Sequence, residues 1–228
     1  MTTPFLSIDH ITKIFHPSQE IEVIGLQDII LCFDEGEFVV ISGPSGSGKT
    51  TLLNIIGGLD HATSGTVTLV DQVITGLPES QLSALRRDRI GFVFQAYNLV
   101  PVLTGRENIE YIMKLQGKSQ QECDVRTEAI SDKLGIRDYL EKLPNQMSGG
   151  QQQRVAVARA VAAKPQLILA DEPTANLDSA SAENLMGMMQ QLNEDEGVTI
   201  LFSSHDPLVI NKARHSVILR DGRVFQDQ

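Results

Sequence analysis

Short apolar runs alternate with helical patterns over most of the chain, and this alternation predicts an α/β domain built on a parallel sheet. Between the runs, apolar residues recur every three to four positions, first at Leu52, Ile55, Ile56 and Leu59 and later at Leu185, Met188, Met189 and Leu192. We interpret the methionine stripe as core facing a sheet rather than as a binding surface. The runs have the length and β-branched content of strands buried on both faces: Phe38–Ser42, Ile90–Phe94, Leu167–Ala170 and Val198–Phe202.

The middle of the chain has a different pattern. Between Thr104 and Ala163 strand signals are absent, and Ser/Thr residues stand three positions before Glu at Thr104 and Ser119. Such pairs form capping boxes at helix starts. We therefore expect a single domain, residues 1–228, in which an all-helical insert (96–163) interrupts an α/β core (1–95 and 164–228).

Alternating patterns without helices predict further strands at both ends of the chain. The first forty residues and Thr66–Val73 indicate a small antiparallel sheet. Near the end, Asp221-Gly222 separates two short β-rich runs, Val217–Arg220 and Arg223–Phe225, which is the signal of a two-residue hairpin.

Composition narrows the class of protein. The 228 residues include 19 basic and 29 acidic side chains, a net charge of −10, which disfavours a nucleic-acid binder because such proteins carry a basic footprint. The two cysteines, Cys32 and Cys123, match no metal-ligand spacing and are expected as reduced thiols. No run reaches the roughly 20 apolar residues needed to cross a bilayer, so work at a membrane would require a partner.

A glycine-rich segment after the first buried strand carries the clearest chemistry. It fits G-x-x-x-x-G-K-[ST] in full and opens a helix, as a phosphate-binding loop requires. Its glycines let successive N–H groups face an anion, the lysine supplies a charge for the β- and γ-phosphates, and the final hydroxyl is a Mg²⁺ ligand. A plain Gly/Ser turn before a helix is the weaker alternative. The candidate cradle comprises Gly43, Pro44, Ser45, Gly46, Ser47, Gly48, Lys49, Thr50 and the following Thr51.

Two acidic residues end another buried strand. Asp171 and Glu172 follow Leu167–Ala170, at the carboxyl end where open α/β sheets bind ligands. Asp171 is expected to hold Mg²⁺, and Glu172 to polarise the attacking water. The alternative, an acidic cap before Pro173, loses weight beside a complete phosphate loop.

A second glycine pair helps to distinguish between the classes of nucleotide hydrolase. Asn-Lys-x-Asp, a guanine-specific signal, is absent from the sequence, whereas Ser148-Gly149-Gly150-Gln151 precedes an alanine-rich helix. This predicts a second anion-binding helix N-terminus without a lysine of its own. One chain needs only one triphosphate cradle, so the second would cap the γ-phosphate held by another copy.

At these motifs the sequence resembles the ATP-binding cassette (ABC) transporter family, over essentially its whole length. Met147–Gln151 is similar to the Leu-Ser-Gly-Gly-Gln signature, with Met in place of Leu. The resemblance implies that Gln95 reaches Mg²⁺ and the water, that Asp178 belongs to a loop crossing the dimer interface, and that His205 contacts the γ-phosphate. It also implies that Phe15 stacks on adenine, although an aromatic residue after a strand is as often simple packing.

The phrases Gly57–Asp60, Gly105–Asn108 and Ala170–Asp178 resemble the subgroup that serves lipoprotein release, macrolide efflux and cell division (LolD/MacB/FtsE-like). The implied fold is a P-loop NTPase of ABC type, with a RecA-like parallel sheet, an antiparallel β subdomain and an α-helical insert. The implied cofactors are ATP and Mg²⁺. The catalytic residues would be Glu172, His205 and Lys49, and the metal ligands Thr50, Gln95 and Asp171.

The resemblance also implies partners and a place in the cell. Two copies would sandwich ATP head to tail, and an integral-membrane permease would hold them at the cytoplasmic face of the inner membrane, with no nucleic acid involved. The loop Ala96–Pro101 would line the permease groove, with Tyr97 and Leu99 partly exposed; an ordinary connecting loop is the alternative. The competing functions are a soluble cassette acting on nucleic acid or ribosomes, and a nucleotide binder without turnover.

Overall fold

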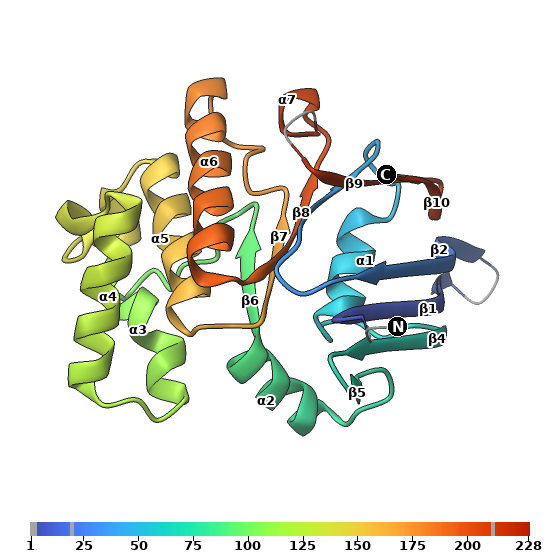
Figure 1. The fold of residues 1–228 in the computed structure, drawn as a ribbon, viewed down its shortest axis with the longest axis horizontal. Coiled ribbons are helices and arrows are strands. Elements are labelled where there is room, and N and C mark those ends of the chain that lie inside the picture. Colours follow the sequence, from blue (N-terminus) through green and yellow to red (C-terminus); the bar gives the residue numbers. More distant parts are fainter. Residues whose placement is uncertain (1–3, 19–20, 211–212) are drawn as a thin grey trace.

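The computed structural model describes residues 4–18, 21–210 and 213–228 (Figure 1). Its centre is a six-stranded sheet in the order β10-β9-β3-β8-β7-β6, in which all neighbours are parallel except the β9–β10 pair. The parallel α/β core expected from the apolar runs is therefore confirmed. Its strands are β3 (Phe38–Ser42), β6 (Ile90–Phe94), β7 (Leu167–Asp171), β8 (Thr199–Ser204), β9 (His215–Arg220) and β10 (Arg223–Asp227).

A second, antiparallel sheet lies beside the core, in the order β2-β1-β4-β5. Helix α1 (Lys49–Ile56) and the strands of both sheets share one apolar core, to which Leu52, Phe33 and Ile41 contribute fully buried side chains. The small antiparallel sheet predicted from the alternating patterns is present. Its strands are β1 (Leu6–Ser18), β2 (Ile21–Phe33), β4 (Ser64–Leu69) and β5 (Gln72–Val73).

One residue of the predicted α1 face is misplaced. The helix ends at Ile56, Gly58 takes a positive φ of 62°, and Leu59 lies beyond the helix with 47% of its surface exposed. The prediction that Leu59 continues the buried face is wrong, because the glycine pair ends the helix first.

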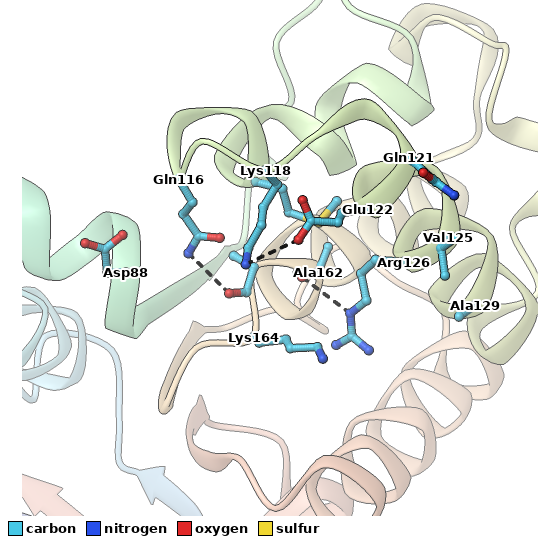
Figure 2. A pocket seen from close by; sticks show the side chains of 12 residues that line it. Asp88, Gln116, Lys118, Gln121, Glu122, Val125, Arg126, Ala129, Ala162 and Lys164 are labelled. Atoms are coloured by element: carbon cyan, nitrogen blue, oxygen red, sulfur yellow. Dashed lines mark hydrogen bonds and ion pairs between the residues drawn. The ribbon is translucent and has the colours of Figure 1, made fainter.

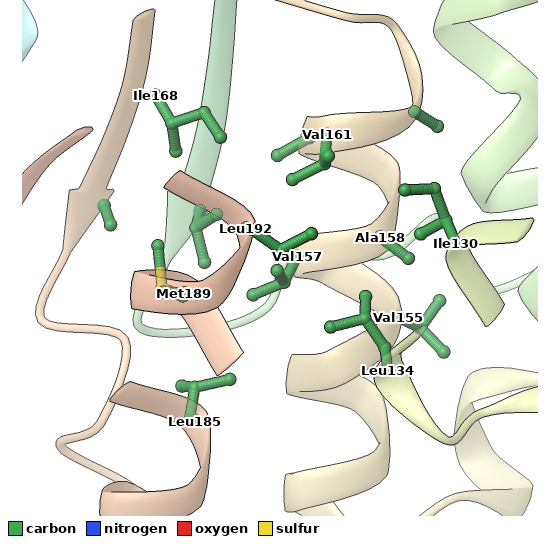
Figure 3. Close-up of a cluster of buried hydrophobic side chains, with 14 of the residues drawn as sticks. Ile130, Leu134, Val155, Val157, Ala158, Val161, Ile168, Leu185, Met189 and Leu192 are labelled. Atoms are coloured by element: carbon green, nitrogen blue, oxygen red, sulfur yellow. The ribbon is translucent and has the colours of Figure 1, made fainter. Parts of the chain in front are cut away.

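The helical insert contains α3 (Gly105–Leu115), α4 (Gln120–Leu134) and α5 (Gly149–Ala162). Thr104 and Ser119 form the two capping boxes that the sequence predicts. Helix α6 (Ser179–Glu196) packs its apolar side against α5 of the insert and against the core sheet (Figure 3). Met186 and Met189 are fully buried, whereas Met188 lies partly buried at the edge of this core. The methionine stripe therefore faces the core, but the buried face of the helix includes Met186 in place of Met188. The other helices of the described residues are α2 (Glu79–Arg89), the short α7 (Pro207–Ile210) and two single 3-10 turns, Arg137–Tyr139 and Pro144–Gln146.

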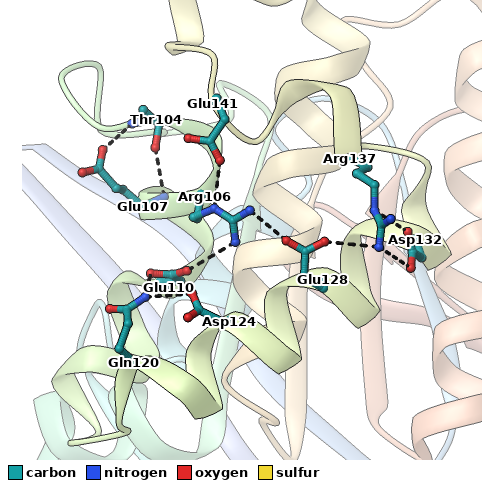
Figure 4. A network of polar contacts seen from close by, with 10 residues as sticks. All are labelled: Thr104, Arg106, Glu107, Glu110, Gln120, Asp124, Glu128, Asp132, Arg137 and Glu141. Carbon is teal, nitrogen blue, oxygen red and sulfur yellow. Dashed lines mark hydrogen bonds and ion pairs between the residues drawn. The ribbon is translucent and has the colours of Figure 1, made fainter.

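An ion-pair network ties the insert together (Figure 4). The Arg106 guanidinium on α3 donates to Glu128 of α4 at 2.8 Å and to Glu141 at 2.9 Å. These hydrogen bonds raise the pKa of Arg106 above its ordinary value. Arg137 pairs with Glu128 from the other side at 3.2 Å. The insert is therefore held by charges of its own as well as by its apolar core.

The C-terminal hairpin lies against the glycine-rich segment. The N–H of Gly222, in the β9–β10 turn, donates to the Ser47 carbonyl at 3.1 Å, and its own carbonyl accepts from Gln27 N–H at 2.7 Å. Both strands of the predicted hairpin are present around Asp221-Gly222. Among the described residues, no helix has the length and apolar character of a membrane span.

Candidate active site

The glycine-rich segment forms a tight loop between β3 and α1. Gly43, Gly46 and Gly48 all take positive φ values, of 145°, 78° and 103°. A Cβ on Gly43 would collide with the Leu219 carbonyl, and one on Gly48 would come within 2.8 Å of the Gly25 carbonyl. Only glycine fits these positions, so the backbone can close around an anion as the motif predicts.

The lysine of this loop is turned into the cradle. Lys49 is 4% exposed, and its Nζ donates to the carbonyl oxygens of Gly43 and Pro44 at 2.9 and 3.1 Å. Beside it, the Ser47 hydroxyl is buried with no hydrogen-bond partner among the described residues. An ammonium group, an unpartnered hydroxyl and a helix N-terminus together form a donor set that fits a polyphosphate.

An oxygen-rich cluster lies at the end of β7. The Asp171 carboxylate accepts hydrogen bonds from Thr50 Oγ1 at 3.1 Å and from Ser203 Oγ at 2.7 Å. Within the described chain, no group of three or more His, Cys, Asp or Glu side chains forms a ready metal cage. One carboxylate and one hydroxyl beside a phosphate cradle fit Mg²⁺, which binds through one or two protein oxygens together with substrate phosphates.

Glu172, the acid that follows Asp171, contacts the two other candidate catalytic residues, Lys49 and His205. Glu172 Oε1 lies 3.4 Å from Lys49 Nζ and 3.3 Å from His205 Nδ1. Its backbone N–H donates to Ser203 Oγ at 2.9 Å, and its φ is +44°, a conformation that non-glycine residues rarely adopt. The Ser203 hydroxyl thus fixes both acids through one side chain. The structure brings Glu172, His205 and Lys49 into contact.

Gln95 follows β6, whose last residue, Phe94, is paired with Asp171 of β7. Gln95 is exposed, and its backbone carbonyl accepts a hydrogen bond from Asn176 Nδ2 at 3.0 Å. In the loop that follows, Tyr97 and Leu99 are half-buried, and Leu99 packs on the core of the insert. Gln95 therefore stands at the same sheet edge as Asp171, on a loop anchored from two sides.

The second cradle opens α5. The Ser148 side chain caps this helix in a reciprocal pair with Gln151, and a Cβ on Gly149 would come within 2.6 Å of the Tyr97 hydroxyl. Gly150 has open space apart from Leu177 at 3.9 Å. Helices α5 and α1 lie on opposite sides of the core sheet (Figure 1). Within one chain, the two cradles are therefore separated by the core sheet.

Phe15 lies on β1 with 38% of its surface exposed. A Cβ on Gly25 would come within 2.5 Å of the Phe15 ring, and the Gly25 carbonyl faces Gly48 of the phosphate loop. Lys13 Nζ stands 4.9 Å from the centre of the same ring. The Phe15 ring is therefore partly exposed, and Gly25 lies between it and the phosphate loop.

Asp178 has a local task that the sequence prediction did not include. Its carboxylate caps α6, accepting from Ser181 N–H at 3.0 Å and Ser181 Oγ at 2.7 Å. These hydrogen bonds lower the pKa of Asp178 below its ordinary value. An acid directly before the helix, followed three residues later by serine, is the signal that could have indicated this cap.

A cavity of about 830 Å³ lies away from these groups (Figure 2). It is bounded by the α3–α4 connection and the end of α5, and Lys118, Glu122, Arg126 and Lys164 line it. Arg126 is already bonded there to the carbonyls of Val161 and Ala162. None of the motif residues lines this cavity.

Residues 26–175 match the family described as ABC transporter. An uncharacterized ABC transporter ATP-binding protein of Methanocaldococcus jannaschii, MJ0796, is 41% identical over 98% of this chain and 96% of its own length. The chain belongs to the ABC transporter family. The lipoprotein-releasing system ATP-binding protein LolD 1 of Chlorobium chlorochromatii is also 41% identical, over the whole chain and 93% of that protein.

Larger relatives and solved cassettes complete the comparison. The macrolide export ATP-binding/permease protein MacB of Bradyrhizobium diazoefficiens is 42% identical over the whole chain, which spans only 35% of that protein. A dimeric structure of the MJ0796 cassette in a post-hydrolysis state bound to ADP and Pi superposes with a TM-score of 0.90 at 40% identity, covering 98% of this chain and 97% of that one. The predicted fold class, ABC family and ATPase class are confirmed. The comparisons give no support to a cassette acting on nucleic acid or ribosomes.

Three residues of this cassette's site were given no role of their own from the sequence. Ser203 bonds both acids. Asn176 bonds the backbone carbonyl of Gln95, and Arg159 bonds those of Tyr97 and Asn98. Each acts across segments far apart in the chain, so no local spacing marks it. The serine pair at the end of β8, directly before His205, is the nearest available signal.

Proposed function

We propose that this chain is the ATP-hydrolysing subunit of a membrane transporter, resembling those of lipoprotein release and macrolide efflux. The observation that carries the proposal is the contact of Glu172 with both Lys49 and His205, beside the Thr50–Asp171 pair. Phosphoryl transfer to water needs positioned charges more than covalent chemistry, and this arrangement supplies them.

The residues present fit ATP and Mg²⁺. The phosphate loop, from Gly43 to Thr51, would hold the triphosphate, and the Phe15 ring offers a surface for the base. Thr50, Asp171 and Gln95 would hold Mg²⁺, which supplies charge neutralisation at the phosphates when it is bound.

Within the chain itself, Glu172 has the hydrolytic task. Its Oε1 contacts both Lys49 Nζ and His205 Nδ1, so a water hydrogen-bonded to the carboxylate would have a fixed position. Glu172 would orient this water and accept its proton, while Lys49 and His205 would face the γ-phosphate.

A second copy of the chain would complete each site. The helix N-terminus at Ser148, Gly149, Gly150 and Gln151 lies on the opposite side of the sheet from α1, so it suits the phosphate held by another molecule. The dimeric MJ0796 cassettes support this arrangement. Asp178, next to the loop that holds Gln95, would lie near the shared interface.

The permease would dock in a separate cavity. A volume of about 350 Å³ is lined by β6, α2, α3 and α5, and it presents the stacked rings of Phe92 and Phe94. Leu59 and Leu115, 47% and 53% exposed, also line it. Since the MacB relatives are named as joined ATP-binding and permease proteins, a cytoplasmic segment of a permease is the proposed occupant. That contact would hold the cassette at the cytoplasmic face of the inner membrane.

Replacing Glu172 by Gln tests the hydrolytic assignment. The variant keeps the cradle, so ATP affinity measured by calorimetry should stay within about threefold, while phosphate release should fall by at least ~100-fold. Lys49→Ala should instead weaken ATP binding itself. Glu35→Gln, an exposed acid in the turn before β3, is the matched control and should hydrolyse at the wild-type rate. Hydrolysis by Glu172→Gln within about threefold of wild type would remove Glu172 from this role.

A further inference from the structure

A fully buried serine at the end of β8 bonds to both acids of the site. Ser203 is 0% exposed, and its Oγ lies 2.7 Å from Asp171 Oδ1 and 2.9 Å from the backbone nitrogen of Glu172. One hydroxyl thus contacts the side chain of the first acid and the backbone of the second. The proposed function gives this hydroxyl no part of its own.

The core sheet places Ser203 beside the acids. Ser203 is the register partner of Asp171 in the parallel pairing of β8 with β7. Side chains two residues apart on a strand share a face, and Leu201 and Leu169 both pack in the apolar core that includes α1. Ser203 and Asp171 therefore leave neighbouring strands on the α1 side of the sheet. Strand pairing, and not a loop, fixes this contact.

The direction of each hydrogen bond follows from the number of protons available. A serine hydroxyl has one proton to donate and lone pairs that accept. The N–H of Glu172 can only donate, so Ser203 Oγ accepts from it and gives its own proton to Asp171 Oδ1. Thr50 Oγ1 donates to the same carboxylate oxygen at 3.1 Å. Both donors meet at Oδ1, and within the described part of the chain Asp171 Oδ2 accepts no hydrogen bond.

The second contact holds an unusual backbone conformation. Glu172 has a φ of +44°, and Pro173 follows it, although the residue before a proline ordinarily has an extended backbone. Such a conformation persists only where surrounding contacts hold it. The Glu172 N–H bond to Ser203 and the bond from Ala175 N–H to the Glu172 carbonyl at 3.1 Å are contacts of this kind. The direction in which the Glu172 side chain leaves the strand therefore depends on Ser203.

We propose that Ser203 is a positioning residue for ATP hydrolysis. Its hydroxyl turns the Asp171 carboxylate so that Oδ2 is left for Mg²⁺, and it holds Glu172 in the conformation that brings Oε1 to Lys49 and His205. The inference rests on the proposed function and adds a residue that acts through the two acids. Ser203 itself has no contact with the nucleotide in this role.

A buried hydroxyl at the other end of the same strand offers a matched control. Thr199 is also 0% exposed, and its Oγ1 accepts a hydrogen bond from Gly36 N–H at 2.9 Å. Thr199→Val and Ser203→Ala each remove one buried hydroxyl from β8, so both should lower the Tm. Only Ser203→Ala removes a group that touches the acids. A loss of function confined to Ser203→Ala would therefore not be a consequence of lower stability.

The first measurement is the rate of phosphate release at saturating ATP and Mg²⁺. We expect kcat to fall at least tenfold in Ser203→Ala, because Glu172 is no longer held beside Lys49 and His205. Thr199→Val should keep kcat within twofold of wild type. If Ser203→Ala does not fold, Ser203→Cys has a side chain of similar size whose thiol is a weak donor, and the same results are expected of it.

The second measurement is ATP binding by calorimetry, which needs no turnover. In EDTA the affinity of Ser203→Ala for ATP should stay within twofold of wild type, since the phosphate loop is unchanged. The gain in affinity on adding Mg²⁺ should be at least threefold smaller than in wild type, because the Asp171 carboxylate is free to turn. Thr199→Val should show the wild-type gain.

The possible failures are distinct. A folded Ser203→Ala chain with kcat within threefold of wild type or with an unchanged gain from Mg²⁺ would overturn the inference, as would a Thr199→Val chain that loses as much activity. Each of these results leaves the proposed function intact as long as Glu172→Gln abolishes hydrolysis. Wild-type hydrolysis by Glu172→Gln would contradict the proposed function and remove the basis of the inference with it.

Discussion

Asn108 offers a sharp test of how the loop after Gln95 is held. Its side chain is fully buried at the start of α3, where Oδ1 accepts from Val100 N–H at 2.8 Å. Its Nδ2 donates to the carbonyls of Val100, Leu103 and Thr104 at 3.2, 3.0 and 2.9 Å. One amide thus closes the segment that joins β6 to the helical insert. Replacing it by alanine removes all four contacts.

The expected loss in free energy of unfolding depends on which backbone groups would be left without a hydrogen-bond partner. The Val100 carbonyl still accepts from Leu103 N–H, and the Thr104 carbonyl still accepts from Asn108 N–H within the helix. For Val100 N–H and the Leu103 carbonyl, the Asn108 side chain supplies the only hydrogen bond among the described residues. Val100 and Leu103 are half-buried, so at about 1–2 kcal/mol for each unpaired group, Asn108→Ala should lower the free energy of unfolding by about 3 kcal/mol. For a chain of this size, that corresponds to a fall in Tm of about 6–12 °C.

Thermal and urea unfolding followed by circular dichroism measure this loss. Asn184→Ala, on the exposed side of α6, is the matched control and should change the free energy of unfolding by no more than about 0.5 kcal/mol. A loss below about 1 kcal/mol for Asn108→Ala, with an unchanged dependence on urea, would show that the loop is held by other contacts.

The other predictions concern assembly, capping and base stacking. Light scattering of Glu172→Gln with ATP should show a dimer, and adding Ser148→Arg should abolish it; a dimer that survives this change would contradict the second cradle. Asp178→Ala should destabilise the chain at pH 7, since the depressed pKa of Asp178 means that its stabilising effect is present above the ordinary carboxyl pKa near 4 and is lost as the pH falls through the lower folded value. The difference in Tm from wild type should therefore shrink below about pH 4, and a difference independent of pH would refute the cap. Phe15→Ala should weaken ATP binding by about 0.5–1.5 kcal/mol, as loss of an aromatic stack does, with no change in Tm; a fall in Tm without a change in affinity would show that Phe15 is packing.

The motifs of the site could be predicted because their chemistry is local. The phosphate loop and the Asp171–Glu172 pair each lie within a few consecutive residues, and their neighbouring strand and helix are also visible in the pattern. Ser203 and Arg159 could not be found in this way. Their hydrogen bonds span 31 and 62 residues, so only the folded arrangement of β7, β8 and the insert brings the groups together.

The misplaced end of the first helix has the same origin. Periodicity extends this helix to Leu59, but it ends at the glycine pair before that residue, and Leu59 lines the cavity proposed for docking. Spacing alone can thus predict burial for an apolar residue that lies beyond the end of a helix and is exposed. That the loop Ala96–Pro101 lines the permease groove stays a prediction: Tyr97 and Leu99 are half-buried, and Leu99 packs on the core of the insert.

The order of strands in the core sheet has a consequence for how the chain is made on the ribosome. β3, which leads into the phosphate loop, lies between β8 and β9, and Val39 pairs with Leu201 and His215. The loop also rests against Leu219 and Gly222. A nascent chain therefore carries its complete glycine-rich motif long before the strands that support it have been synthesised. We expect nucleotide affinity to arise only once the β9–β10 hairpin has left the exit tunnel, because the loop rests on Leu219 and Gly222.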